Sequence, residues 1–310
     1  MFDSLWVEKY RPTTLDDILL SDTNREIFTG YKQTRQVPNI LFVGTAGIGK
    51  TSLAKIIAND IIPESQYLYI NASDENGIDT IRLQVTNFAK TRSITTDLKI
   101  VILDEVDGLT IDAQRALRNT MEEYSNNTRF ILTANYKHRV IQPLQSRSQS
   151  FDLTPTTKQC ASRVVYILKN EKIKVCDRQK ALLSDFIKQY YPDLRKIINE
   201  LQKCCIDGQL KITTMGKHSE IVKNIFELLQ RDSLKVREYV IKNEQVFNAD
   251  YTTLLKLMFD YIVTQHASNM STKKQLLVIS EHLYRSAIVL DQEINFHSCC
   301  IALEQSALNS

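Results

Sequence analysis

A glycine-rich turn with an adjacent lysine constrains this chain more than any other feature of its sequence. The segment GTAGIGKTS (44–52) directly follows the apolar run NILFV and fits the pattern G-x-x-x-x-G-K-[ST]. Three of the eight glycines fall within six positions of it. Glycine lets the backbone curl so that several N–H groups converge on one anion, and the following helix adds the positive end of its dipole. The segment therefore predicts a phosphate-binding loop between a strand and a helix.

We expect the whole loop to contact a nucleotide. Lys50 is a point charge that can reach the terminal phosphates, and the Thr51 hydroxyl can ligate Mg²⁺. The alternative is an ordinary glycine-rich turn beside a chance lysine, and the strand and helix on either side argue against it. The predicted nucleotide-binding residues of the loop are Gly44, Thr45, Ala46, Gly47, Ile48, Gly49, Lys50, Thr51 and Ser52.

A second motif, VILDEVD (101–107), places two acids at the end of a nearly continuous aliphatic run. Acidic side chains ending a buried strand are costly unless they face a site, although an isolated pair is often just a solvated strand end. We expect Asp104 to hold the water shell of Mg²⁺ and Glu105 to polarise the attacking water as a general base. Together the two motifs predict a domain that binds and hydrolyses ATP with Mg²⁺.

The chain alternates strands and helices up to about Pro155 and is helical afterwards. Because a strand–helix alternation is typical of a parallel α/β sheet, we expect such a sheet in the first part. A chain of 310 residues suits two or three domains, and we expect 1–154 to bind ATP, with helical domains at 155–215 and 216–310. The expected strands are 39–43, 66–72, 99–105 and 128–135.

The composition excludes several classes of protein. A net charge of +3 gives no large basic field, so contacts with nucleic acid must come from a local patch. No window approaches 18 apolar residues and the first residues do not resemble a signal peptide, so we expect no membrane partner. Six cysteines without metal-ligand spacing indicate reduced thiols and a cytoplasmic location.

Five stretches of the sequence carry a resemblance to a known family: WVEKYRPTTLDDIL, GTAGIGKTSLA, INASDENGID, ILDEVDGLTIDAQRALRNTMEEYSNNTRFILTANY and IQPLQSRS. They resemble the AAA+ ATPase subunits of replicative sliding-clamp loaders. The similarity is to the small subunits of replication factor C and to the equivalent ATPase subunit of T-even-type bacteriophages, and the short chain and LTANY favour the phage type. The resemblance implies an AAA+ P-loop parallel-sheet domain, a small helical lid and an all-α collar.

The resemblance also implies catalytic roles for three residues outside the two motifs. Asn135 would be the first sensor, a neutral amide that holds the water or the γ-phosphate. Arg147 would be the arginine finger offered to a neighbouring subunit, although Ser148 stands where the family has cysteine. Arg195 would be the second sensor, reaching the phosphates from the lid. Taken alone, Asn135 could be a turn-forming asparagine before a loop, and Arg147 and Arg195 could be solvated arginines.

The N-terminal segment resembles the part of the family that wraps the adenine. Trp6 is expected to be a packing anchor beside this slot. Asn71 matches the position of a polar switch residue that turns Glu105 aside until DNA is bound. The predicted adenine-binding residues are Val7, Tyr10, Arg11 and Pro12.

The helix expected over 111–124 carries basic residues on the face opposite its apolar residues. Arg115 and Arg118 lie one turn apart there and can follow a phosphate backbone, and Arg82 on the preceding helix can add a contact. A solvated face is the alternative for each arginine. Repeated around a spiral of subunits, such contacts would be salt-sensitive and independent of sequence.

The resemblance implies that the chain uses ATP to open a sliding clamp and load it onto primer–template DNA during replication. Its partners would be the clamp, the DNA and other loader subunits in a ring of four or five ATPase-type chains. The expected clamp-binding surface lies after Asn76 and around 85–95. The location would be the host cytoplasm for a phage protein and the nucleus for a eukaryotic one. Two alternatives share the phosphate site: another AAA+ DNA motor, such as a helicase or branch-migration subunit, and a scaffold subunit that binds ATP without hydrolysing it.

Overall fold

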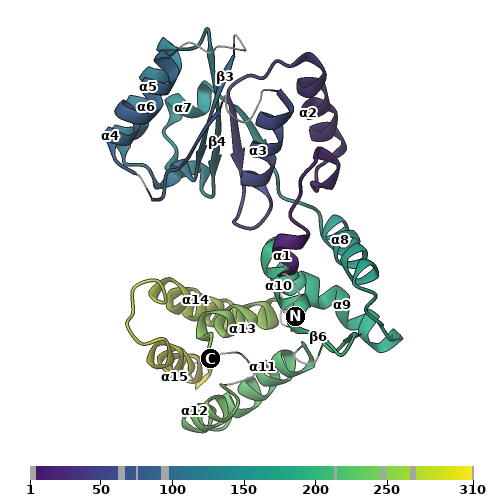
Figure 1. The fold of residues 1–310 in the computed structure, drawn as a ribbon. Helices are drawn as coiled ribbons and strands as arrows, with labels where there is room; N and C mark the ends of the chain where they lie inside the picture. Colours follow the sequence, from purple (N-terminus) through teal and green to yellow (C-terminus); the bar gives the residue numbers. More distant parts are fainter. Residues whose placement is uncertain are drawn as a thin grey trace. The chain divides into compact units, whose positions relative to one another are not determined.

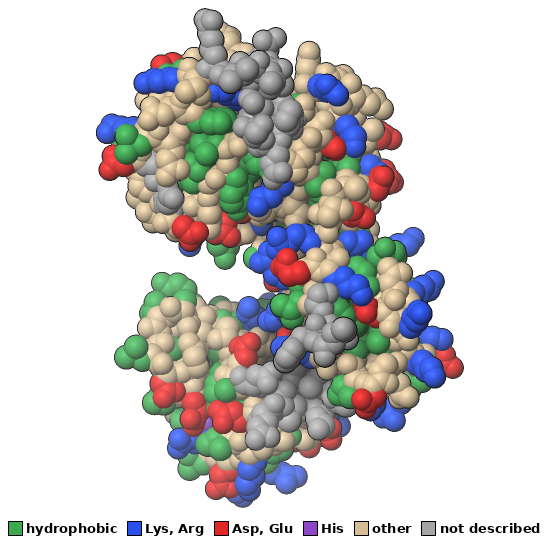
Figure 2. Space-filling model, viewed as in Figure 1, with side chains coloured by type: hydrophobic (Ala, Val, Ile, Leu, Met, Phe, Trp, Pro, Cys, Tyr) green, Lys and Arg blue, Asp and Glu red, His purple; other side chains and the backbone are tan. Residues whose placement is uncertain are grey.

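The computed structural model describes residues 5–61, 67–74, 76–91, 98–212, 215–244, 247, 249–265 and 270–308. The chain divides into two units, Met1–Lys211 and Ile212–Ser310, which are drawn in Figure 1. None of the helices in the described ranges has both the length and the apolar content needed to cross a membrane. On the face drawn in Figure 2, basic and acidic side chains are interspersed, which fits the net charge of +3.

A five-stranded parallel sheet lies at the centre of the first unit, in the order β2-β3-β4-β1-β5. The four strands expected from the sequence are present. The fifth, β5, was not expected because its sequence QSFD is short and largely polar, which suits the exposed edge that it occupies. The bounds are β1 Ile40–Val43, β2 Tyr67–Asn71, β3 Lys99–Asp104, β4 Thr128–Ala134 and β5 Gln149–Asp152.

Helices cover both faces of the sheet, with α2 and α3 on one side and α4 to α7 on the other (Figure 1). The aliphatic run of β3 is buried on both sides: Ile100 and Ile102 pack into one core, and Val101 and Leu103 into the other. This explains its continuous apolar sequence. The bounds are α2 Asp22–Thr34, α3 Lys50–Ile61, α4 Ile78–Thr80, α5 Thr86–Lys90, α6 Ile111–Glu123 and α7 Gln142–Ser146.

Short helical turns shape the loops around the sheet. The helical segment between β2 and β3 includes a π-helical turn, η3, that separates α4 from α5. Three 3₁₀ turns lie before α2, after β3 and before α7. The bounds of these turns are η1 Leu15–Asp17, η3 Ile81–Val85, η4 Val106–Gly108 and η5 Lys137–Arg139.

Three helices and a small hairpin complete the first unit as a lid. The short helix α1 (Trp6–Lys9) packs against this lid. Trp6 is buried there, and its backbone N–H donates to Gln202 Oε1 at 2.9 Å. The sequence predicts only helices after about Pro155, but Asp207 and Gly208 take positive φ angles of 51° and 69° and close a hairpin. The bounds are α8 Thr157–Asn170, α9 Asp177–Tyr190, α10 Leu194–Lys203, β6 Cys205–Ile206 and β7 Gln209–Leu210.

The second unit consists of helices packed around a core of its own. Ile225, Met258, Ile279 and Phe296 lie fully buried in that core. The helices agree with the helical region expected from the sequence. In α12 only Ser233, Val236 and Val240 are buried. The bounds are α11 Met215–Leu229, α12 Ser233–Lys242, α13 Tyr251–Gln265, α14 Met270–Arg285 and α15 Gln292–Leu308.

Candidate functional site

The two sequence motifs meet at the carboxyl edge of the parallel sheet. The glycine-rich loop follows β1, Asp104 ends β3 and Asn135 follows β4. These three strands are neighbours, with Val43 paired to Ala134 and Leu103 paired to Leu132. Because the carboxyl ends of parallel strands share one edge, the functional groups of all three segments are brought together there.

The glycine-rich loop adopts a backbone that requires glycine. Gly44, Gly47 and Gly49 have φ angles of 139°, 78° and 96°, a region that residues with a Cβ seldom adopt. A Cβ on Gly44 would also overlap the side chain of Ile48. The helix α3 then begins at Lys50, so its free N–H groups and its dipole point into the loop.

Lys50 is buried and joins the loop to the neighbouring strand. Its Nζ donates to the carbonyls of Gly44 and Thr45 and to Asn135 Oδ1, each at 2.8 Å. Burial lowers the pKa of Lys50, while the nearby carboxylates, Asp104 foremost, oppose that shift. The ammonium group therefore has one acceptor for each of its three hydrogens and lies where Asn135 can share a phosphate with it.

The Asp104 carboxylate is the most densely bonded group of the site. Thr51 Oγ1 lies 2.9 and 2.8 Å from its two oxygens, Thr133 Oγ1 donates to Oδ1 at 2.5 Å, and the Tyr69 hydroxyl donates to Oδ2 at 3.0 Å. Only 8% of Asp104 is exposed. A carboxylate and a hydroxyl side by side form the oxygen donor set that Mg²⁺ prefers, so the residues present fit this ion.

Glu105 is held in a strained turn beside Asp104. Its φ of 58° is left-handed, and such strain is typical of functional positions. Its N–H donates to Thr133 Oγ1 at 2.9 Å, and its carboxylate accepts from Ser73 Oγ at 2.5 Å. The expected switch residue Asn71 instead bonds Asp74 and the N–H of Ser73. The structure thus brings Ser73, rather than Asn71, to Glu105.

Two groups that fix the site were missed by the sequence analysis. Asp107 accepts from the N–H groups of Asn135 and Tyr136 at 3.0–3.2 Å, and so fixes the segment after β4. Thr133 bonds both acids of the second motif. Asp107 could have been found as the third acid of VILDEVD, whereas nothing in the sequence singles out Thr133.

A cavity of about 540 Å³ opens between the N-terminal segment, the loop and the lid. This volume is within the usual range for small-molecule sites. Asp104, Glu105 and Tyr69 form part of its wall. The predicted nucleotide-binding residues that line it are Val7, Tyr10, Arg11, Pro12, Gly47, Ile48, Gly49, Thr51, Ser52 and Arg195.

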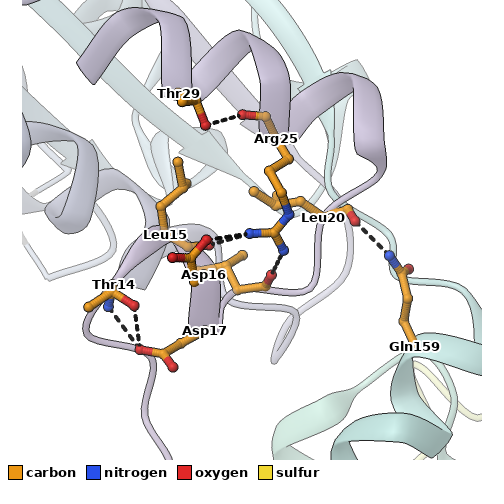
Figure 3. A network of polar contacts seen from close by, with 9 residues as sticks. Thr14, Leu15, Asp16, Asp17, Leu20, Arg25, Thr29 and Gln159 are labelled. Atoms are coloured by element: carbon orange, nitrogen blue, oxygen red, sulfur yellow. Dashed lines mark hydrogen bonds and ion pairs between the residues drawn. The ribbon is translucent and has the colours of Figure 1, made fainter. Parts of the chain in front are cut away.

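The N-terminal segment, which lines this cavity, is held in place by a network of hydrogen bonds and an ion pair. Figure 3 shows the Arg25 guanidinium reaching Asp16 and the carbonyl of Leu15. Asp17 in the same turn accepts from the N–H and the hydroxyl of Thr14 at 3.0 and 2.8 Å. Since Asp17 lines the cavity, this network fixes one of its walls.

The lid contacts the loop and the N-terminal segment directly. The N–H of Arg195 donates to the carbonyl of Gly47 at 3.3 Å, and a Cβ on Gly47 would overlap the Asp193 carboxylate. Arg163 donates to the carbonyl of Tyr10 at 3.0 Å. The Tyr10 hydroxyl donates to Glu171 of the lid at 2.6 Å. Arg163, Glu171 and Asp193 were not predicted, because each acts through a contact between segments distant in sequence.

Arg147 lies at the other edge of the sheet. It precedes β5, whose first residue Gln149 pairs with Ile40 at the start of β1, and its carbonyl accepts from Asn39 Nδ2 at 3.4 Å. Its guanidinium forms an ion pair with Glu122 near the end of α6 and donates to the carbonyl of Pro143 at 3.1 Å. Arg147 is therefore separated from the cavity by the length of the sheet.

Ser148 is unusual in its surroundings. Its hydroxyl oxygen is buried and has no hydrogen-bond partner among the described residues. A buried hydroxyl without a partner is unfavourable, whereas a cysteine thiol behaves as a small apolar group. The cysteine expected from the resemblance would therefore suit this environment better than the serine present.

The three arginines expected to bind DNA are placed on α6 and on η3, which pack together. Arg115 is exposed and pairs with Asp112 at 3.0 Å, and Arg118 donates to Asn119 at 3.2 Å through Nε. Arg82 is exposed on η3. The opposite face of α6 is buried, as its apolar pattern predicts. In the expected clamp-binding stretch, positions 92–95 lie outside the described residues.

Two family models match the chain. The model of the ATPase family associated with various cellular activities (AAA) matches residues 40–155. The model of the AAA+ ATPase lid domain of the sliding-clamp-loader large subunit matches residues 152–212. The two matches meet where the sheet ends and the lid begins.

Curated relatives cover nearly the whole chain. The replication factor C small subunit of Sulfurisphaera tokodaii is 35% identical and aligns over 95% of this chain and 93% of its own length. That of Aeropyrum pernix is 36% identical over 95% of this chain and 86% of its own length. The solved structure of the Thermotoga maritima RuvB Holliday junction branch migration motor is similar in fold, with a TM-score of 0.51 at 17% identity over 81% of this chain and 80% of that one. The chain therefore belongs to the AAA+ ATPases and, among them, to the replication factor C small-subunit family of sliding-clamp-loader ATPases.

Proposed function

We propose that this chain hydrolyses ATP at a site completed by a neighbouring loader subunit, and that the cycle opens a sliding clamp and loads it onto primer–template DNA. The observation that carries this proposal is the position of Arg147. The finger precedes β5 at the amino edge of the sheet, whereas the phosphate loop follows β1 at the carboxyl edge. A four-residue strand such as β1 spans about 13 Å at ~3.3 Å per residue. This separation of Arg147 from its own nucleotide supports a role for it at the nucleotide of a neighbour.

Within one subunit, the carboxyl edge supplies the rest of the ATPase machinery. Lys50 and the loop N–H groups bind the β- and γ-phosphates, and Asn135 holds the γ-phosphate or the attacking water. Glu105 takes the proton of that water as the general base. Thr51 and Asp104 would hold Mg²⁺, and the ion would neutralise charge on the phosphates.

The lid and the N-terminal segment supply the recognition of the nucleotide. Val7, Tyr10, Arg11 and Pro12 surround the adenine, and Arg195 reaches the phosphates from α10. Because the N–H of Arg195 already bonds the loop at Gly47, the position of the lid depends on the loop. Binding of ATP can thus be transmitted to the lid by direct contact.

We further propose that Arg82, Arg115 and Arg118 contact DNA phosphates, and that Ser73 and Asn71 together control Glu105. Their positions on η3 and α6, which pack together, support the first point, and Arg82 and Arg115 are exposed there. Around a ring of four or five ATPase-type subunits these contacts would add up. Binding would then be independent of sequence and would weaken steeply with salt.

We retain the division into an ATPase domain at 1–154, a lid at 155–215 and a collar at 216–310. The limits of the two family models and the separation of the units after Lys211 support it. The collar would assemble the ring, and the complex would work in the compartment that holds the replicating DNA. That compartment is the cytoplasm, or the nucleus in a eukaryote.

The test measures ATP hydrolysis by the assembled loader with and without the cognate clamp and primer–template DNA. We expect the wild-type rate to rise when clamp and DNA are both present. With Glu105→Gln in this chain, ATP and clamp should still bind while hydrolysis and release stop. The matched control is Glu123→Gln, an exposed glutamate on α6.

Two results would redirect the proposal. Stimulation by long duplex or single strands with no response to the clamp indicates a DNA motor, the function named for the structural neighbour of similar fold. Release of the clamp at the normal rate with Glu105→Gln indicates a scaffold subunit that does not hydrolyse ATP. The identity to replication factor C small subunits along the chain favours the loader over both.

A further inference from the structure

A tyrosine on β2 reaches the carboxylate that we assign to Mg²⁺. Tyr69 lies two residues before Asn71, and Asn71 pairs with Asp104 across the two strands. The Tyr69 side chain lies in the cavity wall, and its hydroxyl donates to Asp104 Oδ2 at 3.0 Å. No motif of the sequence includes this residue.

The bond from Tyr69 matters because few hydroxyl hydrogens are available to the two oxygens of Asp104. Thr51 Oγ1 lies almost equally far from the two carboxylate oxygens, at 2.9 and 2.8 Å. A hydroxyl has one hydrogen, so Thr51 can donate to only one of them at a time. Thr133 is committed to Oδ1, and Tyr69 is the further donor to Oδ2. Without Tyr69, Oδ2 would depend on the hydroxyl hydrogen of Thr51, which Oδ1 can accept equally well.

The Tyr69 ring is itself held between two elements. The ammonium of Lys55 lies 4.0 Å from the centre of the ring, on the electron-rich face. Lys55 is on α3, one turn after Thr51, so the contact ties β2 to the helix that follows the phosphate loop. The hydroxyl therefore has a defined position relative to both Thr51 and Asp104.

We propose that Tyr69 is a positioning residue for Asp104, holding its carboxylate in the orientation that meets the water shell of Mg²⁺. Tyr69 acts through Asp104 and has no direct part in the chemistry. The inference rests on the proposed function in one respect, the assignment of Asp104 to the metal. Groups that orient the ligands of a metal typically contribute about 10–100-fold to its affinity.

The test replaces Tyr69 by phenylalanine, which removes the hydroxyl but keeps the ring and its contact with Lys55. Binding of a fluorescent, non-hydrolysable ATP analogue to the full chain is measured across a Mg²⁺ titration and in EDTA. Because Thr133 and Thr51 still bond Asp104, we expect the Mg²⁺ concentration at half-effect to rise about three- to tenfold, below the usual range for such groups. Binding in EDTA should not change, and the ATPase rate of the assembled loader should recover at high Mg²⁺.

Two further variants separate the possible failures. Asp104→Asn tests the metal assignment itself: an unchanged Mg²⁺ requirement in this variant overturns the proposed role of Asp104 and the role of Tyr69 with it. If Asp104→Asn raises the requirement and Tyr69→Phe does not, the inference about Tyr69 alone is wrong. Tyr67→Phe is the matched control, since it removes a hydroxyl on the same strand from a ring packed against the core. An equal shift in this control would show a general effect of β2 and would also overturn the inference.

Discussion

The two edges of the sheet hold their functional groups in opposite ways. At the carboxyl edge, Lys50 and Asp104 are buried, and each has several partners from separate elements. At the amino edge, Arg147 is partly exposed and pairs with one acid, Glu122. One half of the proposed active site is thus preformed, and the other half is a single side chain that can change partners.

Burial explains the difference in energetic terms. A buried charge that loses its partners costs several kcal/mol, so the groups around Lys50 and Asp104 remain fixed. An exposed ion pair is worth about 0–1 kcal/mol, so Arg147 can leave Glu122 for a phosphate at little cost. The comparison shows which half of the site is rigid and which half responds to assembly.

The largest expected effect comes from removing Arg147, the half of the proposed site that can change partners. Arg147→Ala should lower DNA- and clamp-stimulated hydrolysis by the assembled loader about 10³-fold or more, because an arginine finger stabilises charge that develops on the transferred phosphoryl group. Binding of ATP to the isolated chain should stay unchanged, since Arg147 is at the opposite edge. The control is Arg139→Ala, another exposed arginine of the same domain. A full rate of hydrolysis in the Arg147 variant would contradict the shared site.

The second prediction concerns the preformed half. Thr133→Val keeps the shape of the side chain but leaves the N–H of Glu105 and one oxygen of Asp104 with a partner fewer, which should cost about 1–3 kcal/mol in the free energy of unfolding. Denaturant unfolding of the full chain measures this. Thr128→Val is the control, because it removes a buried hydroxyl at the start of the same strand. This control should leave ATP binding intact. A loss below about 0.5 kcal/mol for Thr133→Val would mean that the bonds to Thr133 add little.

The wall of the cavity supplies a pH-dependent prediction. The hydrogen bond from the Thr14 hydroxyl holds the pKa of Asp17 below its usual range. A depressed pKa in the folded state stabilises the protein above the unfolded value of about 3.9, and this contribution is lost as the pH falls through the folded value. Asp17→Ala should therefore cost about 1 kcal/mol at pH 7, as the loss of a capping residue does.

The measurement is the free energy of unfolding of both proteins between pH 7 and pH 3. The difference between them should be constant down to about pH 5 and shrink below about pH 4. Asp16→Ala is the control, because the Asp16 side chain is 94% exposed and its pair with Arg25 should add little. A difference that grows on acidification would contradict the sign of the shift.

The smallest effect should come from Glu122, the ion-pair partner of Arg147. Glu122→Gln keeps a hydrogen-bond acceptor but removes the charge that holds Arg147 in the free subunit. Since an exposed pair is worth up to about 1 kcal/mol, the subunit concentration for half-maximal ATPase should fall about two- to fivefold. Titration of this chain into its partner subunits, clamp and DNA tests it, with Glu123→Gln alongside. A reduced maximal rate would instead show that Glu122 orients the finger within the assembled site.

The parts of the site that could be predicted are those whose chemistry is local in sequence. The phosphate loop can be recognised from Gly47, Gly49 and Lys50, and the second motif can be recognised from its adjacent acids. The structure brings these groups together as the strand order requires. Their roles in catalysis, like those of Arg147 and Arg195, remain predictions.

The residues that escaped prediction act across strands or between segments. Tyr69, Ser73 and Thr133 are ordinary residues of their strands and loops until the register places them beside Asp104 and Glu105. The fifth strand escaped for a different reason, since an exposed edge strand needs no apolar pattern. At Asn71 the structure adds a second residue: Ser73, two positions further on, contacts Glu105, and Asn71 bonds the N–H of Ser73. The switch role of Asn71 stays a prediction.

Strand β5 has a consequence for communication around a ring. It begins just after Arg147 and is followed closely by α8, the first helix of the lid. A displacement of the lid at one nucleotide would therefore pull on Arg147, the residue that we propose acts at the next nucleotide. Successive sites would then hydrolyse ATP in order rather than independently, because the short edge strand connects the lid of one site to the proposed finger of the next.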